Sequence, residues 1–310
     1  MVLTEFNLIK RFFTRPAKQG STQLSVGDDC ALLVVPEGFE LAITADTMVE
    51  GVHFFVDVDP VHLGYKLLAV NLSDLASMGA EPVSVTLALT MPKVDELWLE
   101  RFAQGLFSLA DKYAVDLIGG DTTSGSLTLT IQAMGLVPKQ QALLRSAAKV
   151  GDLIYVTGCI GDAGLGLKIK QGYVCADDLQ ALRRFNMPEP RVAEGLAIRS
   201  VANACVDISD GLAADLGHIL EKSGVGASLD YQDIPVSSAV FEYISATHDW
   251  RMPLIAGDDY ELCFTIAPEN IGKINIDCTC IGIIEQEQGL RLVREGRVSD
   301  FVIGGFEHFS

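Results

Sequence analysis

The sequence Leu117-Ile118-Gly119-Gly120-Asp121-Thr122-Thr123 places two glycines, one carboxylate and two hydroxyl side chains directly after an apolar run. This order predicts a strand that ends in a loop, where the backbone can come close to a ligand because glycine has no Cβ atom. The oxygen atoms of Asp121, Thr122 and Thr123 are of the kind that Mg²⁺ prefers. By itself, a Gly-Gly-Asp-Thr sequence is more typical of an ordinary turn. Its meaning therefore depends on the other acidic residues of the chain.

The composition indicates a folded, acidic protein. The chain has 310 residues, of which 49% are hydrophobic and 21% charged, and this suits one large or two medium domains. With 41 acidic against 23 basic residues, the net charge of −18 disfavours binding to nucleic acid. No apolar run reaches the roughly 18 residues that a membrane span needs, and no signal peptide is recognised. Seven cysteines without a Cys-x-x-Cys motif predict reduced thiols and a cytoplasmic protein.

Strands and helices alternate along the first part of the chain, which predicts an α/β or α+β domain with mixed sheets. A short helix is expected after Thr4, followed by a polar loop over residues 15–25. Residues 27–35 and 41–47 are expected to form a hairpin with acids at both of its ends. The remaining predicted elements of this part are helices over 59–79 and 94–113 and strands over 83–89 and 126–137.

A second unit follows a polar connecting segment. We expect domains over residues 1–137 and 152–310, joined by residues 138–151. The predicted strands of the second unit cover 152–157, 205–208, 225–231, 259–264, 280–284 and 290–293. Its predicted helices cover 177–185, 191–200 and the residues after 211. The glycine-rich residues 158–164 match no P-loop and are also typical of a tight turn from strand to helix.

Nine aspartates stand at predicted strand or helix ends beside small residues: Asp28, Asp29, Asp46, Asp74, Asp121, Asp207, Asp210, Asp258 and Asp259. Each one alone is typical of a turn or a helix cap. If several of them converge, two carboxylates about 4 Å apart repel by roughly 4 kcal/mol at an effective dielectric of 20, so cations must be present. Ligands that offer only oxygen favour Mg²⁺ or Ca²⁺ over zinc, and Mg²⁺ held by few carboxylates usually also binds phosphates.

An acidic, glycine-lined site of this kind points to phosphoryl transfer, although the common phosphate-binding motifs are absent from the sequence. Gly272-Lys273 is followed by Ile274 and so does not complete a Walker A motif, and neither His-Arg-Asp nor Asp-Phe-Gly occurs. Taken singly, His53 is typical of a surface histidine, Arg145 of a solvated loop charge and Phe306 of a core residue.

Nine segments in a fixed order, spread from residue 26 to 309, resemble the thiamine-monophosphate kinase family, within the superfamily of aminoimidazole ribonucleotide synthetase-like ATP-binding proteins. The segments are Val26-Gly27-Asp28-Asp29-Cys30-Ala31, Ile43-Thr44-Ala45-Asp46-Thr47, His53-Phe54, residues 71–80 (Asn-Leu-Ser-Asp-Leu-Ala-Ser-Met-Gly-Ala), residues 119–123, Arg145-Ser146, Asp207-Ile208-Ser209-Asp210-Gly211-Leu212, Gly257-Asp258-Asp259-Tyr260-Glu261-Leu262 and Gly305-Phe306-Glu307-His308-Phe309.

The resemblance implies a two-domain fold whose N-terminal sheet pairs with its copy in a homodimer, with ATP near that interface. It implies transfer of a phosphoryl group from ATP to thiamine monophosphate, with several Mg²⁺ ions. The implied metal ligands are Asp29, Thr44, Asp46, Asp74, Asp121, Asp207 and Asp210. The implied ATP contacts are Gly120, Asp121, Arg145 and Ser209, and the implied contacts to thiamine monophosphate are His53, Asp258 and Phe306, the last by a cation–π contact. Neither nucleic acid nor a membrane is expected as a partner.

Three positions depart from the family pattern. Ala45 stands where relatives often carry Thr, Asp258 where we expect Glu, and Phe306 where we expect Tyr or Trp. The acceptor phosphate is already anionic, so no strong general base is needed and direct in-line transfer is expected. Three alternatives remain at this point: another enzyme of the superfamily, a non-catalytic protein that binds divalent cations, and a metal-dependent phosphatase.

Overall fold

The computed structural model describes residues 4–173 and 178–306. The chain folds into two compact units. Residues 1–75 and 80–140 form the N-terminal unit, and residues 76–79 and 141–310 form the C-terminal unit. Both units combine helices with a β-sheet, so the prediction of mixed α/β domains is confirmed. In the part of the chain that is described, no helix is both long and apolar enough to cross a membrane.

A four-stranded sheet is the centre of the N-terminal unit, with the strand order β3-β6-β4-β5. The strands are β3 (Phe39–Val49), β4 (Glu81–Met91), β5 (Asp116–Ser124) and β6 (Thr128–Pro138). Strand β6 pairs antiparallel with both β3 and β4, whereas β4 and β5 are parallel. A parallel pair needs a crossover connection, and here α3 supplies it. A separate two-stranded sheet contains β1 (Thr22–Leu24) and β2 (Leu32–Leu33).

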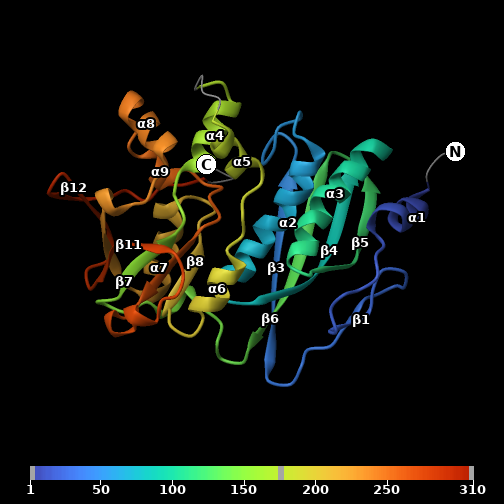
Figure 1. The fold of residues 1–310 in the computed structure, drawn as a ribbon, viewed down its shortest axis with the longest axis horizontal. Coiled ribbons are helices and arrows are strands. Elements are labelled where there is room, and N and C mark those ends of the chain that lie inside the picture. The colour runs from blue at the N-terminus through green and yellow to red at the C-terminus, as the bar shows by residue number, and fades with distance from the viewer. Residues whose placement is uncertain (1–3, 174–177, 307–310) are drawn as a thin grey trace. The chain divides into compact units, whose positions relative to one another are not determined.

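Two long helices, α2 (Pro60–Ser77) and α3 (Glu96–Lys112), cover one face of this sheet (Figure 1). Asp59 caps α2 through its side chain, at the predicted helix start, and Asp95 caps α3 one residue after the predicted start at residue 94. The helices cross at glycines, since a Cβ atom on Gly64 would lie 2.1 Å from the carbonyl oxygen of Phe102. The first helical segment consists of α1 (Glu5–Leu8), directly followed by the π-helical turn η1 (Ile9–Phe13).

Three predictions for this unit are wrong, one of them the polar loop over residues 15–25, which contains β1. The stretch around Gly119 does not end its strand, because β5 continues through Asp121 to Ser124 in pairing with β4. Residues 27–35 and 41–47 do not form a hairpin with each other either. Instead, β2 pairs with β1, and β1 lies in the segment that was expected to be a polar loop. Strand β3 pairs with β6, which lies far along the chain.

The C-terminal unit contains a seven-stranded sheet with the order β13-β12-β9-β11-β7-β10-β8. Its strands are β7 (Leu153–Thr157), β8 (Ala204–Asp207), β9 (Gly226–Asp230), β10 (Leu262–Ile266), β11 (Cys278–Glu285), β12 (Gly289–Arg294) and β13 (Arg297–Asp300). All neighbouring strands are antiparallel except β12 and β9. The buried core of this unit includes Val156, Val206 and Leu216, which come from two of the strands and from helix α7.

The helices of this unit are α4 (Asp162–Lys170), α5 (Leu179–Asn186), α6 (Val192–Ile198), α7 (Leu212–Ser223), α8 (Ser238–Thr247) and α9 (Met252–Ile255), with 3-10 turns η2 (Arg145–Ala147), η3 (Tyr231–Asp233) and η4 (Pro268–Lys273). Residues 158–161 form the turn from β7 into α4, and residues 162–164 begin the helix, in agreement with the interpretation of this glycine-rich segment as a tight turn from strand to helix. Sequence patterns missed α8 and β13, and the start of the helix predicted over 177–185 lies outside the described residues.

Candidate functional site

A cavity of about 790 Å³ opens in the N-terminal unit, on the face of the sheet opposite to α2 and α3. It contains three of the predicted site residues, Asp29, Gly120 and Asp121. Apolar side chains form much of the remaining wall: Phe6, Ile9, Phe13, Leu33, Leu117, Ile118 and Met134. The loop around Asp29 and the middle of β5 therefore meet at one pocket, with acidic and apolar surfaces side by side.

The backbone at Gly120 has a physical need for glycine that does not depend on a ligand. Its φ is +148°, and a Cβ atom here would lie 1.8 Å from the carbonyl oxygen of Leu87 on the neighbouring strand. Any side chain would thus disrupt the pairing of β5 with β4. The contact of Gly120 with a nucleotide remains a prediction, although Gly120 lies in the wall of the pocket.

A second group of predicted ligands joins β3 to α2. The hydroxyl of Thr44 donates a hydrogen bond to a carboxylate oxygen of Asp74, so two of these side chains are in direct contact. The backbone N–H of Asp46 donates to the side-chain oxygen of Asn71, at 3.1 Å, and fixes β3 against the same helix. Thr44, Asp46 and Asp74 therefore share one region, and their oxygen atoms suit a hard cation such as Mg²⁺.

The two groups of the N-terminal unit point to opposite faces of the sheet. Asp121 lies in a row with Ala88 and Thr130, whereas Asp46 lies in the adjacent row with Ile131. Successive rows of a pleated sheet face opposite sides. Among residues 4–173 and 178–306, no three His, Cys, Asp or Glu side chains are grouped closely enough to hold one metal ion.

His53 is held in a defined orientation after β3. The backbone N–H of Val49 donates to Nδ1 of His53, at 3.0 Å. Nδ1 must be unprotonated to accept this hydrogen bond, which leaves the proton of the neutral imidazole on Nε2. The ring is thus oriented by a turn of its own segment, and a contact with substrate remains a prediction.

In the C-terminal unit, the structure brings together three segments that are far apart in the sequence. The carbonyl oxygen of Ser209 accepts a hydrogen bond from the N–H of Asp258, at 2.8 Å, and the carbonyl oxygen of Asp210 accepts one from the N–H of Phe306, at 3.2 Å. Since Asp207 ends β8 directly before this loop, five of the predicted site residues lie in one small region. The ring of Phe306 is 50% exposed and can meet a ligand.

Asp215 organises the central loop of this region, and sequence reasoning missed it. One of its carboxylate oxygens accepts hydrogen bonds from three consecutive backbone N–H groups, those of Ser209 (2.9 Å), Asp210 (3.0 Å) and Gly211 (3.2 Å). Burial raises the pKa of Asp215 to about 7, although these hydrogen bonds and the charge of Arg145 act in the opposite direction. An acid in the first turn of a helix after Ser-Asp-Gly is the sequence signal that could have identified it.

Arg145 lies close enough to this loop for its charge to lower the pKa of Asp215. Its backbone carbonyl accepts a hydrogen bond from the hydroxyl of Ser223 in α7, at 2.9 Å. The predicted ATP contacts Arg145 and Ser209 thus both adjoin α7: the backbone of Arg145 at the end of the helix and Ser209 at its first turn. Together with the carboxylates of Asp207 and Asp210, they form a polar region suited to binding phosphate groups through cations.

Comparisons with protein families agree with both units. Residues 27–137 match the model of the AIR synthase related protein N-terminal domain, and residues 149–295 match that of the C-terminal domain. Among curated proteins, the thiamine-monophosphate kinases of Haemophilus influenzae and Escherichia coli are each 45% identical to this chain. Each of these alignments covers 100% of this chain and 99% of the relative.

Solved structures show the same fold. The crystal structure of thiamine-monophosphate kinase from Stenotrophomonas maltophilia K279a has a TM-score of 0.86 and 43% identity, and it covers 96% of this chain and 98% of its own. A structure of AaThiL complexed with AMPPCP and TMP has a TM-score of 0.81 and 28% identity, with 89% of both chains covered. The two-domain architecture expected from the motifs is thereby confirmed.

Proposed function

Because the chain belongs to the thiamine-monophosphate kinase family of the AIR synthase related proteins, we propose that it transfers the γ-phosphoryl group of ATP to thiamine monophosphate, giving ADP and thiamine diphosphate. This reaction is the last step in making thiamine diphosphate. The observation that carries the proposal is the hydrogen-bonded region in which Ser209 contacts Asp258 and Asp210 contacts Phe306. Here the residues proposed for ATP and those proposed for the acceptor are direct neighbours. The AaThiL complex with AMPPCP, an ATP analogue, and TMP supports the same substrates.

Mg²⁺ fits the donors that the structure offers, because they are carboxylate and hydroxyl oxygens throughout. We assign the cation-binding role to two groups in the N-terminal unit, Asp29 with Asp121 and Thr44 with Asp46 and Asp74, and to Asp207 and Asp210 in the C-terminal unit. When bound, such ions supply positive charge that stabilises the negative charge on the transferred group.

The residues of the chain serve mainly to position the substrates. Gly120, Asp121, Arg145 and Ser209 are assigned to ATP, with the guanidinium of Arg145 neutralising phosphate charge. Asp258, His53 and the exposed ring of Phe306 are assigned to thiamine monophosphate, whose cationic thiazolium favours an aromatic face. The acceptor phosphate attacks directly and in line, without a phosphorylated enzyme intermediate.

We assign the homodimer to the open face of the N-terminal sheet. Its edge strand β3 is eleven residues long and carries Ile43, which is 57% exposed. Long strands at a sheet edge tend to pair or to be covered. We further assign the functional domains to residues 1–137 and 152–310, with residues 138–151 between them, and the cellular location to the cytoplasm. The free thiols of Cys205 and Cys263 agree with that location.

The decisive experiment mixes purified protein with Mg²⁺ and ATP, with and without thiamine monophosphate, and measures thiamine diphosphate and inorganic phosphate. We expect thiamine diphosphate only when the acceptor is present. Phosphate release without the acceptor would instead indicate a phosphatase, and no turnover at all would indicate a binding protein. A protein that retains covalent ³²P after ATP is added would contradict direct transfer.

The metal assignment is tested by Asp121→Asn and Asp207→Asn, one in each unit. Each change removes a charge but retains the shape of the side chain, so we expect a fall in turnover of about 10-fold or more with the thermal midpoint nearly unchanged. Both carboxylates are assigned to cations, so raising the Mg²⁺ concentration should restore part of the activity. Full activity of either variant at all Mg²⁺ concentrations would show that its assignment is wrong.

A further inference from the structure

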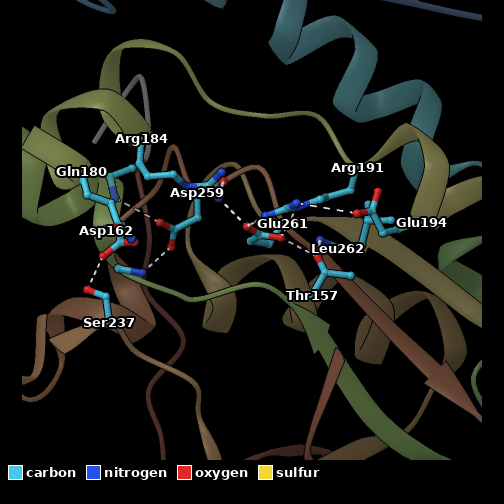
Figure 2. Close-up of polar contacts among 12 residues, drawn as sticks. Thr157, Asp162, Gln180, Arg184, Arg191, Glu194, Ser237, Asp259, Glu261 and Leu262 are labelled. Carbon is cyan, nitrogen blue, oxygen red and sulfur yellow. Dashed lines mark hydrogen bonds and ion pairs between the residues drawn. The ribbon is translucent and has the colours of Figure 1, made fainter. Parts of the chain in front are cut away.

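A buried ionic cluster lies directly beside the segment that carries Asp258. At its centre is Glu261, whose side chain is 0% exposed. Figure 2 shows Arg184, Arg191 and Thr157 converging on this carboxylate. Arg191 donates to both of its oxygens, at 2.6 Å each, and Thr157 donates through its hydroxyl, also at 2.6 Å. Arg184 adds a further hydrogen bond to Glu261.

Asp259 anchors the same segment to a second element. Its carboxyl group accepts hydrogen bonds from the backbone N–H groups of Gly161 (2.7 Å) and Ala163 (3.3 Å), at the start of α4. Gly161 has no side chain with which to cap that helix, so Asp259 satisfies these donors instead. Arg184 also donates to the carbonyl oxygen of Asp259, at 3.1 Å, and thereby joins the two anchors.

The backbone next to these two anchors, Asp259 and Glu261, is strained. Asp258 has φ +69° and Tyr260 has φ +49°, which is the left-handed region that residues with a Cβ atom seldom adopt. Asp259, Tyr260 and Glu261 are buried, whereas Asp258 is only partly buried. Asp258 accepts a hydrogen bond from the Tyr260 hydroxyl, at 3.1 Å. Strain of this kind persists only where surrounding contacts impose it.

The glycine-rich turn after β7 is shaped to admit the cluster. Gly158 has φ +55°, and a Cβ atom here would lie 2.3 Å from a carboxylate oxygen of Glu261. The glycine therefore leaves room for the acid, rather than for a phosphate group. A buried ion cluster also adds little stability compared with apolar packing, because each charge loses its hydration. Its presence beside a strained site segment calls for a different role.

We propose that Glu261, held by Arg184, Arg191 and Thr157, is a positioning residue that fixes the strained backbone of residues 257–261 and thereby sets the place of Asp258 toward the acceptor substrate. The inference rests on the proposed function, since it assigns thiamine monophosphate to Asp258. It predicts that the network governs affinity for the acceptor far more than affinity for ATP, because Asp258 lies within this segment whereas Ser209 meets it through a backbone hydrogen bond.

Glu261→Gln tests the proposal because the amide keeps the shape but replaces one acceptor oxygen by a donor that faces two arginines. We expect the KM for thiamine monophosphate to rise about 10- to 100-fold, the size of effect that misplacing one substrate contact produces. The KM for ATP should change by about twofold or less, well under 1.4 kcal/mol, because Ser209 meets this segment through its backbone carbonyl oxygen and not through its side chain. Arg191→Lys cannot make the paired hydrogen bonds to Glu261, so it should also raise the KM for thiamine monophosphate more than the KM for ATP, but by a smaller factor.

Asp152→Asn provides the matched control. Asp152 is also a buried carboxylate in this sheet, but it lies at the other end of β7 and binds Asn203 and Thr265. The Asp152→Asn variant should lose thermal stability without a change in the KM for thiamine monophosphate or in the KM for ATP. If Glu261→Gln does not fold, Arg191→Lys and Thr157→Val carry the test. Equal changes in both KM values, or the same response in the control, would overturn the positioning role.

Asp258→Asn separates the inference from the function on which it rests. If this variant binds thiamine monophosphate as well as the parent does, the assignment of Asp258 to the acceptor is wrong. If Asp258→Asn raises the KM for thiamine monophosphate and neither Glu261→Gln nor Arg191→Lys does, the proposed function stands and the positioning role of Glu261 is wrong. Isothermal titration with thiamine monophosphate alone should give the same ranking as the KM values.

Discussion

At the scale of single residues, neighbouring acids of this chain have different environments. Asp258 is partly exposed and is assigned to substrate, whereas the adjacent Asp259 is buried and caps a helix. A similar difference is found in the loop after β8, where the backbone N–H groups of the half-buried Ser209 and Asp210 donate to the buried Asp215. Asp258 and Asp259 appear alike in the sequence, but the structure makes the first a ligand candidate and the second an anchor whose carboxyl group holds backbone N–H groups.

The buried acid Asp259 predicts a pH dependence of stability. Burial raises its pKa from 3.8 to about 8, although hydrogen bonds from Gly161 and Ala163 act in the opposite direction. The unfolded chain releases this proton above its ordinary pKa, whereas the folded chain keeps it until about pH 8. The contribution to the free energy of unfolding is therefore complete at acidic pH and declines as the pH rises toward 8.

Asp259→Asn cannot release this proton, so its stability should decline less than that of the parent between pH 5 and pH 8. Urea unfolding of both proteins at the two pH values measures the difference, and all other titrating groups are common to the pair. Identical slopes for parent and variant would show that Asp259 is ionised throughout this range.

At the scale of elements, two glycines determine how closely α2 and α3 pack. Gly105 faces α2, where a Cβ atom would lie 1.9 Å from the carbonyl oxygen of Val61. Gly64 faces α3 in the same way. These helices cover the sheet face that carries Thr44 and Asp46, so their spacing also places Asp74 beside Thr44.

Gly105→Ala should therefore destabilise the N-terminal unit by about 1–3 kcal/mol, the usual cost of overpacking, despite the better helix propensity of alanine. Thermal unfolding of the full chain, compared with Gln104→Ala at the adjacent exposed helix position, measures this effect. An increase in stability would mean that the two helices can move apart at little cost.

At the scale of the whole molecule, the sheet face of the N-terminal unit opposite to α2 and α3 bears an exposed apolar side chain at its edge, that of Ile43 (57% exposed). Ile43 lies in a row with Met134, on the face that α2 and α3 leave uncovered. An apolar position of this kind on a long edge strand favours association with a second copy.

Sedimentation velocity should accordingly find a species of about twice the 33.4 kDa chain mass, in keeping with closed twofold symmetry as the commonest form of homo-oligomer. Ile43→Glu should shift it toward the monomer, because a charge would be buried in the interface. Leu97→Glu, at an exposed position of α3, should not. A parent protein that sediments as a monomer at all concentrations would contradict the homodimer.

The sequence alone was sufficient for the family and for most of the long helices and strands, although it missed short elements such as β1, α8 and β13. The helix start at Asp59 follows from a capping side chain that acts within one turn. The spacing of the acidic motifs along the chain led to the same family as the comparisons did. Both kinds of inference succeed because they depend only on the order of residues along the chain.

Tertiary structure alone determined which distant segments meet. Strand β3 pairs with β6 and not with the nearby β2. Position 120 requires glycine because a Cβ atom there would collide with the backbone of Leu87. Asp215 and Glu261 hold the loops that carry the site residues. These outcomes depend on burial and on hydrogen bonds between residues far apart in the sequence, such as Thr157 and Glu261, which are 104 positions apart. No local pattern encodes such contacts, because their energy arises only when the chain brings the partners together and removes them from water.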